Sequence, residues 1–248
     1  MRLEQHRAGH TPSKTAARSE ASARAADRLT YEFVSIASHE LRAPIAVVHG
    51  IAATLHARLD ELRGEQVHAL LGQLVVQTDR LRDLADQLLD LSQIESGAAA
   101  GPAERFDPGT RLEGLVPRIA GDCAADVHLL VESGRTIVAD PVAFERVAAN
   151  LILNALRYGA PPVEVRVEGD PCLLTVEDRG PGVAPEFVPH LFERFSRSDE
   201  SRRSGAAGAG LGLSIASAYA TALGGELAYE PAEPRGARFT LSLPAARS

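Results

Sequence analysis

The sequence has no tryptophan and a single lysine, Lys14, and aromatic side chains make up only 4% of its 248 residues. The core must therefore be built from Leu, Val, Ile and Ala. The lone lysine excludes both a P-loop and the lysine-dependent machinery of ordinary protein kinases. There are only two cysteines, Cys123 and Cys172, and no cluster of His and Cys lies near them, so we expect buried thiols rather than a disulfide framework.

Long hydrophobic runs are missing as well. No segment approaches the ~18 consecutive apolar residues of a membrane span, and the polar N-terminus lacks the apolar core of a signal peptide. The formal net charge of −7 argues against nucleic acid or an anionic membrane as the main partner. We therefore expect a cytoplasmic chain. With 248 residues, 45% of them hydrophobic, we expect two domains, because a domain typically has about 100 to 150 residues.

Helical periodicity governs the first part of the chain. Residues 1–26, rich in Ala, Arg and Ser, are interpreted as a disordered arm or the end of an upstream helix. Residues 27–97 are predicted to form a helical hairpin that turns near Gly64. Its second helix has a heptad seam, with side chains alternately four and three residues apart: Leu70, Leu74, Gln77, Leu81, Leu84, Leu88 and Leu91. One hairpin has too little core to stand alone, so we expect two copies to form a dimeric four-helix bundle.

A change to mixed α/β periodicity follows a linker at residues 98–105, and residues 106–248 are predicted to form an α/β sandwich. Strands are predicted at residues 129–132, 135–138, 163–168, 173–177, 226–229 and 238–243. Helices are predicted at residues 142–158 and 211–223. The fold class is therefore multidomain, a helical-hairpin domain followed by an α+β domain with helices on one face of a sheet.

An exposed histidine, His39, is predicted in the first helix of the hairpin. The apolar stripe of that helix consists of Ala37, Leu41, Ile45, Val48, Ala52, Leu55, Leu59 and Leu62. His39 is two residues from both Ala37 and Leu41, about 200° around the helix, so it is predicted to point to solvent. A neutral imidazole is a nucleophile, and Glu40 can accept its second N–H and orient the ring. Taken alone, a surface histidine is most simply explained as a solvated side chain.

Two asparagines, Asn150 and Asn154, are four residues apart in a predicted helix, so both amides project from one face. Amide oxygens suit Mg²⁺, a hard cation that shares its oxygen ligands with substrate phosphates. Arg157 and Tyr158 follow on the next turn, where a guanidinium can contact a phosphate. Asparagine within a helix is often only tolerated, but here two lie on one face while aliphatic side chains occupy the other.

Two glycine-containing segments suit a nucleotide. Asp178 follows a predicted strand, where its carboxylate can accept a hydrogen bond from the exocyclic amine of adenine, and Gly180 and Gly182 let the backbone approach the ring. An ordinary turn would use the same residue types. The second segment leads into a helix, whose N-terminal N–H groups suit a phosphate, and its spacing differs from the dinucleotide-binding fingerprint. Its cradle residues are Gly208, Gly210, Leu211 and Gly212.

These segments, in this order, resemble those of a known family. Residues 33–45 are similar to the phosphoacceptor box of bacterial two-component sensor histidine kinases. The later motifs resemble the ATP-binding fold that those kinases share with gyrase, Hsp90 chaperones and mismatch-repair ATPases. The resemblance implies that His39 is the phosphoacceptor, with Glu40 beside it. It also implies Asn154 as the Mg²⁺ ligand, Asn150 as a polar partner near the phosphates and Asp178 as the adenine anchor.

The remaining implied site residues form a backbone cradle: Gly180, Gly182, Gly208, Gly210 and Gly212. Residues 191–195 resemble the aromatic box of the family, which flanks a lid at residues 196–209. For Phe192 and Phe195, core packing is the alternative explanation.

The activity implied is ATP- and Mg²⁺-dependent autophosphorylation of His39, followed by transfer to an aspartate of a response-regulator receiver domain. A second copy of the chain and an upstream sensor module are the other implied partners. A nucleotide-binding dimeric scaffold, or another ATPase of the same superfamily without phosphotransfer, stays open. Two departures are Ala43, where the family often has Thr or Asn that supports phosphatase activity, and Ala207 in place of a glycine.

Overall fold

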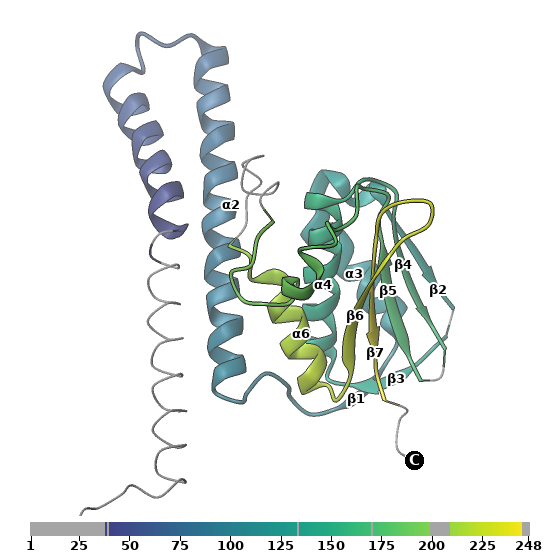
Figure 1. The fold of residues 1–248 in the computed structure, drawn as a ribbon. Coiled ribbons are helices and arrows are strands. Elements are labelled where there is room, and N and C mark those ends of the chain that lie inside the picture. Colours follow the sequence, from purple (N-terminus) through teal and green to yellow (C-terminus); the bar gives the residue numbers. More distant parts are fainter. Residues whose placement is uncertain (1–37, 39, 133, 170, 199–208, 245–248) are drawn as a thin grey trace, which may run out of the picture. The chain divides into compact units, whose positions relative to one another are not determined.

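The computed structural model describes residues 38, 40–132, 134–169, 171–198 and 209–244 (Figure 1). The chain divides into two compact units, residues 1–81 and 82–248, which are described separately. Two parts of the expected machinery lie outside the described residues: His39, and residues 199–208 of the expected lid, which include the cradle residue Gly208.

The first unit is the expected helical hairpin. A helix at residues 40–58 is followed by a short turn and then by the long helix α2 (Gly64–Glu95), and Figure 1 shows the two lying side by side. The heptad seam of α2 is confirmed, because all seven of its predicted members are buried or half-buried.

The apolar stripe of the first helix differs from the expected one. Pro44 and Ile51 are buried on its inner side, although neither was placed in the stripe. Ile45 and Leu59, which were, are 52% and 57% exposed. The buried line has the spacing of a heptad, which turns about 20° per repeat away from the 3.6-residue stripe used for the prediction.

The second unit is built on a five-stranded sheet in the order β2-β4-β5-β7-β6. Its strands are β2 (Val127–Val131), β4 (Val163–Glu168), β5 (Leu173–Glu177), β6 (Glu226–Pro231) and β7 (Ala237–Ser242). Only β2 and β4 pair in parallel, and the other pairs are antiparallel. A separate two-stranded sheet joins β1 (Glu104–Phe106) to β3 (Ile137–Ala139).

Helices cover one face of the five-stranded sheet (Figure 1). They are α3 (Pro108–Ala120), α4 (Pro141–Tyr158) and α6 (Gly212–Ala222), and two short 3₁₀ helices complete the unit, η1 (Gly121–Asp126) and η2 (Val188–His190). Helix α4 packs on β4 and β5 as well as on α3 and α6. Burial alternates along β4, so its valines face the helices and its charged residues face away. The core between the layers is aliphatic apart from a few rings, including Phe144 and Phe239.

Most of the regular structure follows the sequence pattern. The bounds of β4 and β5 are those predicted, whereas β1, α3 and η1 were not foreseen. Helix α3 contains Gly109, Gly114 and Pro117, residue types that weaken a helix, so its apolar positions alone did not reveal it. Strand β1 takes up the last two residues of the segment expected to be a linker. Cys172 is buried as expected. The expectation of a buried thiol is wrong for Cys123, which is exposed because it lies in η1, a short helix at the surface.

The last turns of α2, from residue 82 onward, belong to the second unit. The hydroxyl of Tyr219 on α6 donates to Oδ1 of Asp90 at 2.9 Å, and Nε of Arg146 lies 3.3 Å from the same oxygen. Burial raises the pKa of the Asp90 carboxyl, and both partners favour its ionised form. A buried, doubly paired carboxylate therefore joins this end of α2 to α4 and α6.

The N-terminus of α3 depends on a single side chain, because Oδ1 of Asp107 accepts the N–H groups of Gly109 and Thr110 at 2.8 and 3.2 Å. We expect Asp107→Ala to lower the free energy of unfolding by about 1 kcal/mol, because both donors lose their acceptor. Chemical denaturation measures this. Glu113→Ala, an exposed position in the same helix, is the control and should change stability little. Equal losses in the two variants would contradict the capping role.

Candidate functional site

A cleft of about 600 Å³ lies in the second unit, where the end of α4 meets the start of α6. Four segments line it: α4, the loop after β5, the residues on either side of the undescribed stretch 199–208, and one side chain of α2, Gln87. The predicted site residues that line it are Asn150, Asn154, Arg157, Tyr158, Gly182, Gly210, Leu211 and Gly212. The fold thus gathers predicted site residues that are up to 62 positions apart in the chain, Asn150 and Gly212, into one cavity wall.

The asparagines occupy the cleft side of α4. This helix begins after Asp140, whose carboxylate accepts the N–H of Val142, and its opposite side is fully buried. Nδ2 of Asn150 donates to the carbonyl of Arg146 at 2.8 Å. Its Oδ1 lies 3.1 Å from the place that a side chain at Gly212 would occupy. Asn150 therefore packs against the start of α6, and Asn154 faces the cleft one turn further on.

Arg157 has a partner that the sequence did not indicate. Its guanidinium forms an ion pair with the carboxylate of Asp83 in α2. Both Arg157 and Tyr158 line the cleft, as expected. A phosphate contact by Arg157 requires that its guanidinium be shared with Asp83 or released from it.

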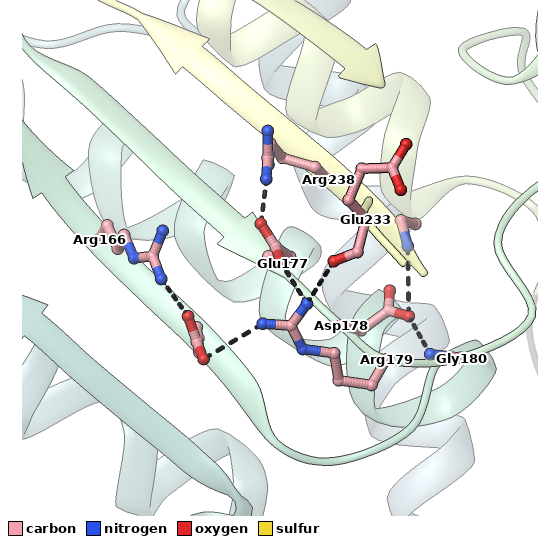
Figure 2. A network of polar contacts seen from close by, with 9 residues as sticks. Arg166, Glu177, Asp178, Arg179, Gly180, Glu233 and Arg238 are labelled. Carbon is pink, nitrogen blue, oxygen red and sulfur yellow. Dashed lines mark hydrogen bonds and ion pairs between the residues drawn. The ribbon is translucent and has the colours of Figure 1, made fainter. Parts of the chain in front are cut away.

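Asp178 immediately follows β5 and is only 3% exposed. Its Oδ1 accepts the N–H of Gly180 at 2.8 Å and that of Ala237 at 3.4 Å (Figure 2). Burial raises the pKa of this carboxyl, and the two N–H groups oppose the rise by favouring the ionised form. Asp178 and Gly180 are not among the residues that line the cleft, whereas Gly182 is.

Two glycines that the sequence analysis missed surround Asp178. A Cβ at Gly159, which ends α4, would lie 2.4 Å from Cγ of Asp178. A Cβ at Gly236, in the turn before β7, would lie 1.9 Å from the Asp178 carbonyl oxygen. Gly236 also has φ +127°, a conformation that favours glycine. The Arg-Gly pair between two predicted strands was the available signal for Gly236, whereas Gly159 gave none beyond its place after a helix.

The glycine-rich segment enters α6 directly. Gly210 has φ +70°, and a Cβ there would lie 2.7 Å from the carbonyl oxygen of Ser196. Leu211 is buried below it, and its carbonyl accepts the first backbone hydrogen bond of α6, from Ile215. Because Gly212 and Leu213, the first residues of α6, line the cleft, the N-terminal end of this helix is suited to stabilise an anion there.

In the first unit, Glu40 is half-buried at the start of the helix at residues 40–58.

Within the aromatic box of the second unit, Phe192 packs edge-on against the buried ring of Phe239 with ring centroids 6.5 Å apart, as the core-packing explanation predicts. Phe195 has φ +62°, an uncommon conformation for a residue with a side chain.

The cleft offers few groups that could hold a metal ion. Among the described residues, no group of three or more His, Cys, Asp or Glu side chains could bind one. The amide oxygen of Asn154 fits a hard cation that takes most of its oxygen ligands from phosphates and water, as Mg²⁺ does. The donors therefore suit a cation that arrives with a nucleotide.

Two family models match the chain in the order of its two units. "His Kinase A (phospho-acceptor) domain" matches residues 30–97, and "Histidine kinase-, DNA gyrase B-, and HSP90-like ATPase" matches residues 139–247. The chain belongs to the two-component sensor histidine kinases. His39 lies within the first match, and the residues that line the cleft, apart from Gln87, lie within the second.

Curated relatives agree with this family. The chain is 34% identical over 229 residues to the signal transduction histidine-protein kinase AfsQ2 of Streptomyces coelicolor. The alignment covers 88% of this chain and 42% of AfsQ2. It is 30% identical over 221 residues to the sensor-like histidine kinase SenX3 of Mycobacterium tuberculosis, covering 86% of this chain and 53% of SenX3. This histidine kinase chain thus spans about half the length of the curated relatives it matches.

Solved structures show the same fold. The histidine kinase AdeS of Acinetobacter baumannii superimposes with a TM-score of 0.65 at 25% identity, over 84% of this chain and 98% of AdeS. Full-length ShkA in complex with AMPPNP superimposes with a TM-score of 0.59 at 28% identity, over 88% of this chain and 46% of ShkA. Within the described part of the kinase chain, no helix combines the length and the apolar character needed to cross a bilayer.

The close approach of Gly159 to Asp178 gives a test of the predicted role of Asp178 as the adenine anchor. We expect Gly159→Ala to push the Asp178 carboxylate out of place and to weaken the binding of a non-hydrolysable ATP analogue by about tenfold, ~1.4 kcal/mol. Isothermal titration measures the affinity. Gly114→Ala, in α3, where a Cβ meets nothing within 4 Å, is the matched control and should bind normally. Normal binding by Gly159→Ala would contradict the placement of the site.

Proposed function

We propose that this chain phosphorylates itself on His39 with Mg²⁺-ATP and passes the phosphoryl group to an aspartate of a response-regulator receiver domain. One observation carries the nucleotide half of the proposal: Asn154, the Gly210–Gly212 segment and the loop after Asp178 come together at one cleft. We place the reaction in the cytoplasm, where ATP is available.

The cleft suggests how ATP would bind. The adenine amine would donate to the Asp178 carboxylate, and the phosphates would lie at the N-terminus of α6 beside Asn154. Mg²⁺ would neutralise charge on the β- and γ-phosphates, and the Asn154 amide oxygen would be its protein ligand. The AMPPNP bound to ShkA, a relative in fold and sequence, supports an adenine nucleotide as the ligand.

The chemistry requires a neutral imidazole at His39. One ring nitrogen would attack the γ-phosphorus, a nitrogen–phosphorus bond would form as the bond to the β,γ-bridging oxygen breaks, and ADP would leave. The other ring nitrogen would then give up its proton, and Glu40, the next residue, is the carboxylate in the chain best placed to hold and receive it. The same phosphoryl group would pass next to the carboxylate of the receiver domain.

A second copy of the chain is the proposed partner of the hairpin. Apolar side chains on both of its helices are exposed in the single chain, among them Ile45, Leu59, Val75 and Val76. Two hairpins that bury these side chains would form the four-helix bundle expected from the sequence. An upstream sensor module would supply the signal.

The phosphoacceptor assignment is tested by His39→Gln. We expect labelling from γ-³²P-ATP to fall below about 1% of the wild-type level, because glutamine has no nucleophilic ring nitrogen, while ATP binding is unchanged. His49→Gln, which alters an exposed histidine of the helix at residues 40–58, should label normally. The wild-type label should be lost in acid, as expected of a phosphoramidate. Undiminished labelling of His39→Gln would show that another residue is phosphorylated, and a wild-type chain that binds ATP without labelling would favour a scaffold.

The metal assignment is tested by comparing the two asparagines. We expect Asn154→Ala to raise the Mg²⁺ concentration needed for half-maximal nucleotide binding by about tenfold, equivalent to ~1.4 kcal/mol, because a ligand oxygen is lost. Asn150→Ala, which removes a contact with the start of α6, should weaken binding without changing the Mg²⁺ dependence. If Asn154→Ala leaves the Mg²⁺ titration unchanged, the metal ligand lies elsewhere.

A further inference from the structure

Glu177, the last residue of β5, is a buried acidic side chain on the face of the sheet away from the helices. Only 4% of it is exposed. Side chains alternate along a strand, so Glu177 points away from α4, while Asp178, the next residue, points toward the end of α4 at Gly159. Burying a carboxylate is costly unless it is paired, so an apolar side chain would cover the sheet more cheaply.

Both carboxylate oxygens of Glu177 are paired with arginines (Figure 2). Oε2 lies 2.7 Å from Nε of Arg238, the residue directly opposite on β7. Oε1 lies 2.8 Å from Nη1 of Arg179. The two guanidinium groups take the place of the water that the carboxylate lost on burial.

Arg179 is fixed by several further contacts. Its Nη1 donates to the carbonyl oxygen of Glu233 at 3.0 Å, and its Nη2 lies 3.4 Å from Oε1 of Glu164 on β4. Its backbone N–H donates to the carbonyl of Ala160 at 2.9 Å. Because Glu233 lies in the β6–β7 turn and Ala160 follows α4, Arg179 ties the end of β5 to three neighbouring segments.

Asp178 is thus bracketed by two residues whose side chains are joined to each other on the opposite face. Rotation of the Asp178 backbone would break the pair between Glu177 and Arg179, so the pair limits where the carboxylate can point. Two N–H groups already occupy Oδ1 of Asp178, and a donor on a ligand would be met by Oδ2.

We propose that Glu177 is a positioning residue for nucleotide recognition: its ion pairs with Arg179 and Arg238 hold the Asp178 carboxylate where it accepts the exocyclic amine of adenine. The proposal rests on the proposed function, in which Asp178 is the adenine anchor. Glu177 does not touch the nucleotide, and its effect reaches the base through Asp178.

The charges support the same arrangement. Unpaired, Glu177 would stand beside the Asp178 carboxylate and oppose its ionisation. The charge of Glu177 does raise the pKa of Asp178, and the charge of Arg179 lowers it again. The arginines therefore offset the repulsion between two acidic residues that are neighbours in the chain.

The test compares two nucleotides that differ only in the group recognised. ATP and its 6-deamino analogue, purine riboside triphosphate, are titrated against the full chain and against Glu177→Ala. We expect the affinity for ATP to fall about tenfold and the affinity for the analogue to change less than about twofold, because only ATP depends on the carboxylate. Glu177→Gln, which keeps the shape and its hydrogen-bonding oxygen, should recover part of the ATP preference. An equal loss for both nucleotides, or no loss for either, would overturn the proposal.

Further variants keep the test decisive. Should Glu177→Ala fail to fold, Arg238→Gln removes one of the two pairs and should lower the ATP preference less, about threefold. Glu168, in β4, lies on the same face of the sheet as Glu177 but takes no part in the ion pairs of Figure 2. Glu168→Gln is therefore the matched control and should keep the full preference for ATP.

Asp178→Asn separates the two levels of the proposal. Asparagine keeps the shape of the side chain but presents an N–H group toward the adenine amine, so the ATP preference should vanish. If Asp178→Asn keeps the preference, the adenine anchor and the role of Glu177 are both wrong. If Asp178→Asn loses it and Glu177→Ala keeps it, only the role of Glu177 is wrong.

Discussion

The burial of the Asp178 carboxylate is the constraint on which the packing around the end of β5 depends. A Cβ at Gly159 would lie 2.4 Å from Cγ of Asp178, and one at Gly180 would lie 3.0 Å from its Oδ1. A Cβ at Gly236 would lie 1.9 Å from the backbone oxygen of Asp178, so only glycine leaves enough room at these three places. These glycines come from the end of α4, the loop after β5 and the turn before β7. The three segments must therefore be in close contact for the Asp178 carboxylate to be buried.

The adjacent residues Glu177 and Asp178 are both buried, but their carboxylates are stabilised in different ways. Glu177 is balanced by two guanidinium groups, which neutralise it. Asp178 is held mainly by backbone N–H groups, which fix its orientation but carry no net charge. A carboxylate stabilised in this second way keeps its charge for a ligand, which suits recognition of a neutral amine on a base. Under the proposed function, Glu177 would hold the loop after β5 and Asp178 would bind the adenine amine.

The phosphoacceptor box and the nucleotide cleft belong to different units of the chain. Phosphoryl transfer depends on positioning and charge neutralisation, so under the proposed function the two units must bring the γ-phosphate and His39 together. Helix α2 is the element that the units share, and its last turns are joined to α4 and α6 by the buried pairs of Asp90. Any movement between the units must either bend this helix or break those pairs.

The amino-acid sequence by itself determined the heptad seam of α2, the bounds of β4 and β5, the helix that carries Asn150 and Asn154, and the order of the motifs that define the family. Each of these depends on residues close together in the chain, where periodicity and spacing are sufficient. Helix α3 was hidden because its glycines and proline weaken the local pattern. The tertiary structure alone decided that Gly159 and Gly236 close around Asp178, that Arg157 pairs with Asp83, and that Glu177 is buried between two arginines. Those contacts join residues from separate elements, and only the packing of the helices on the sheet brings them within reach of one another.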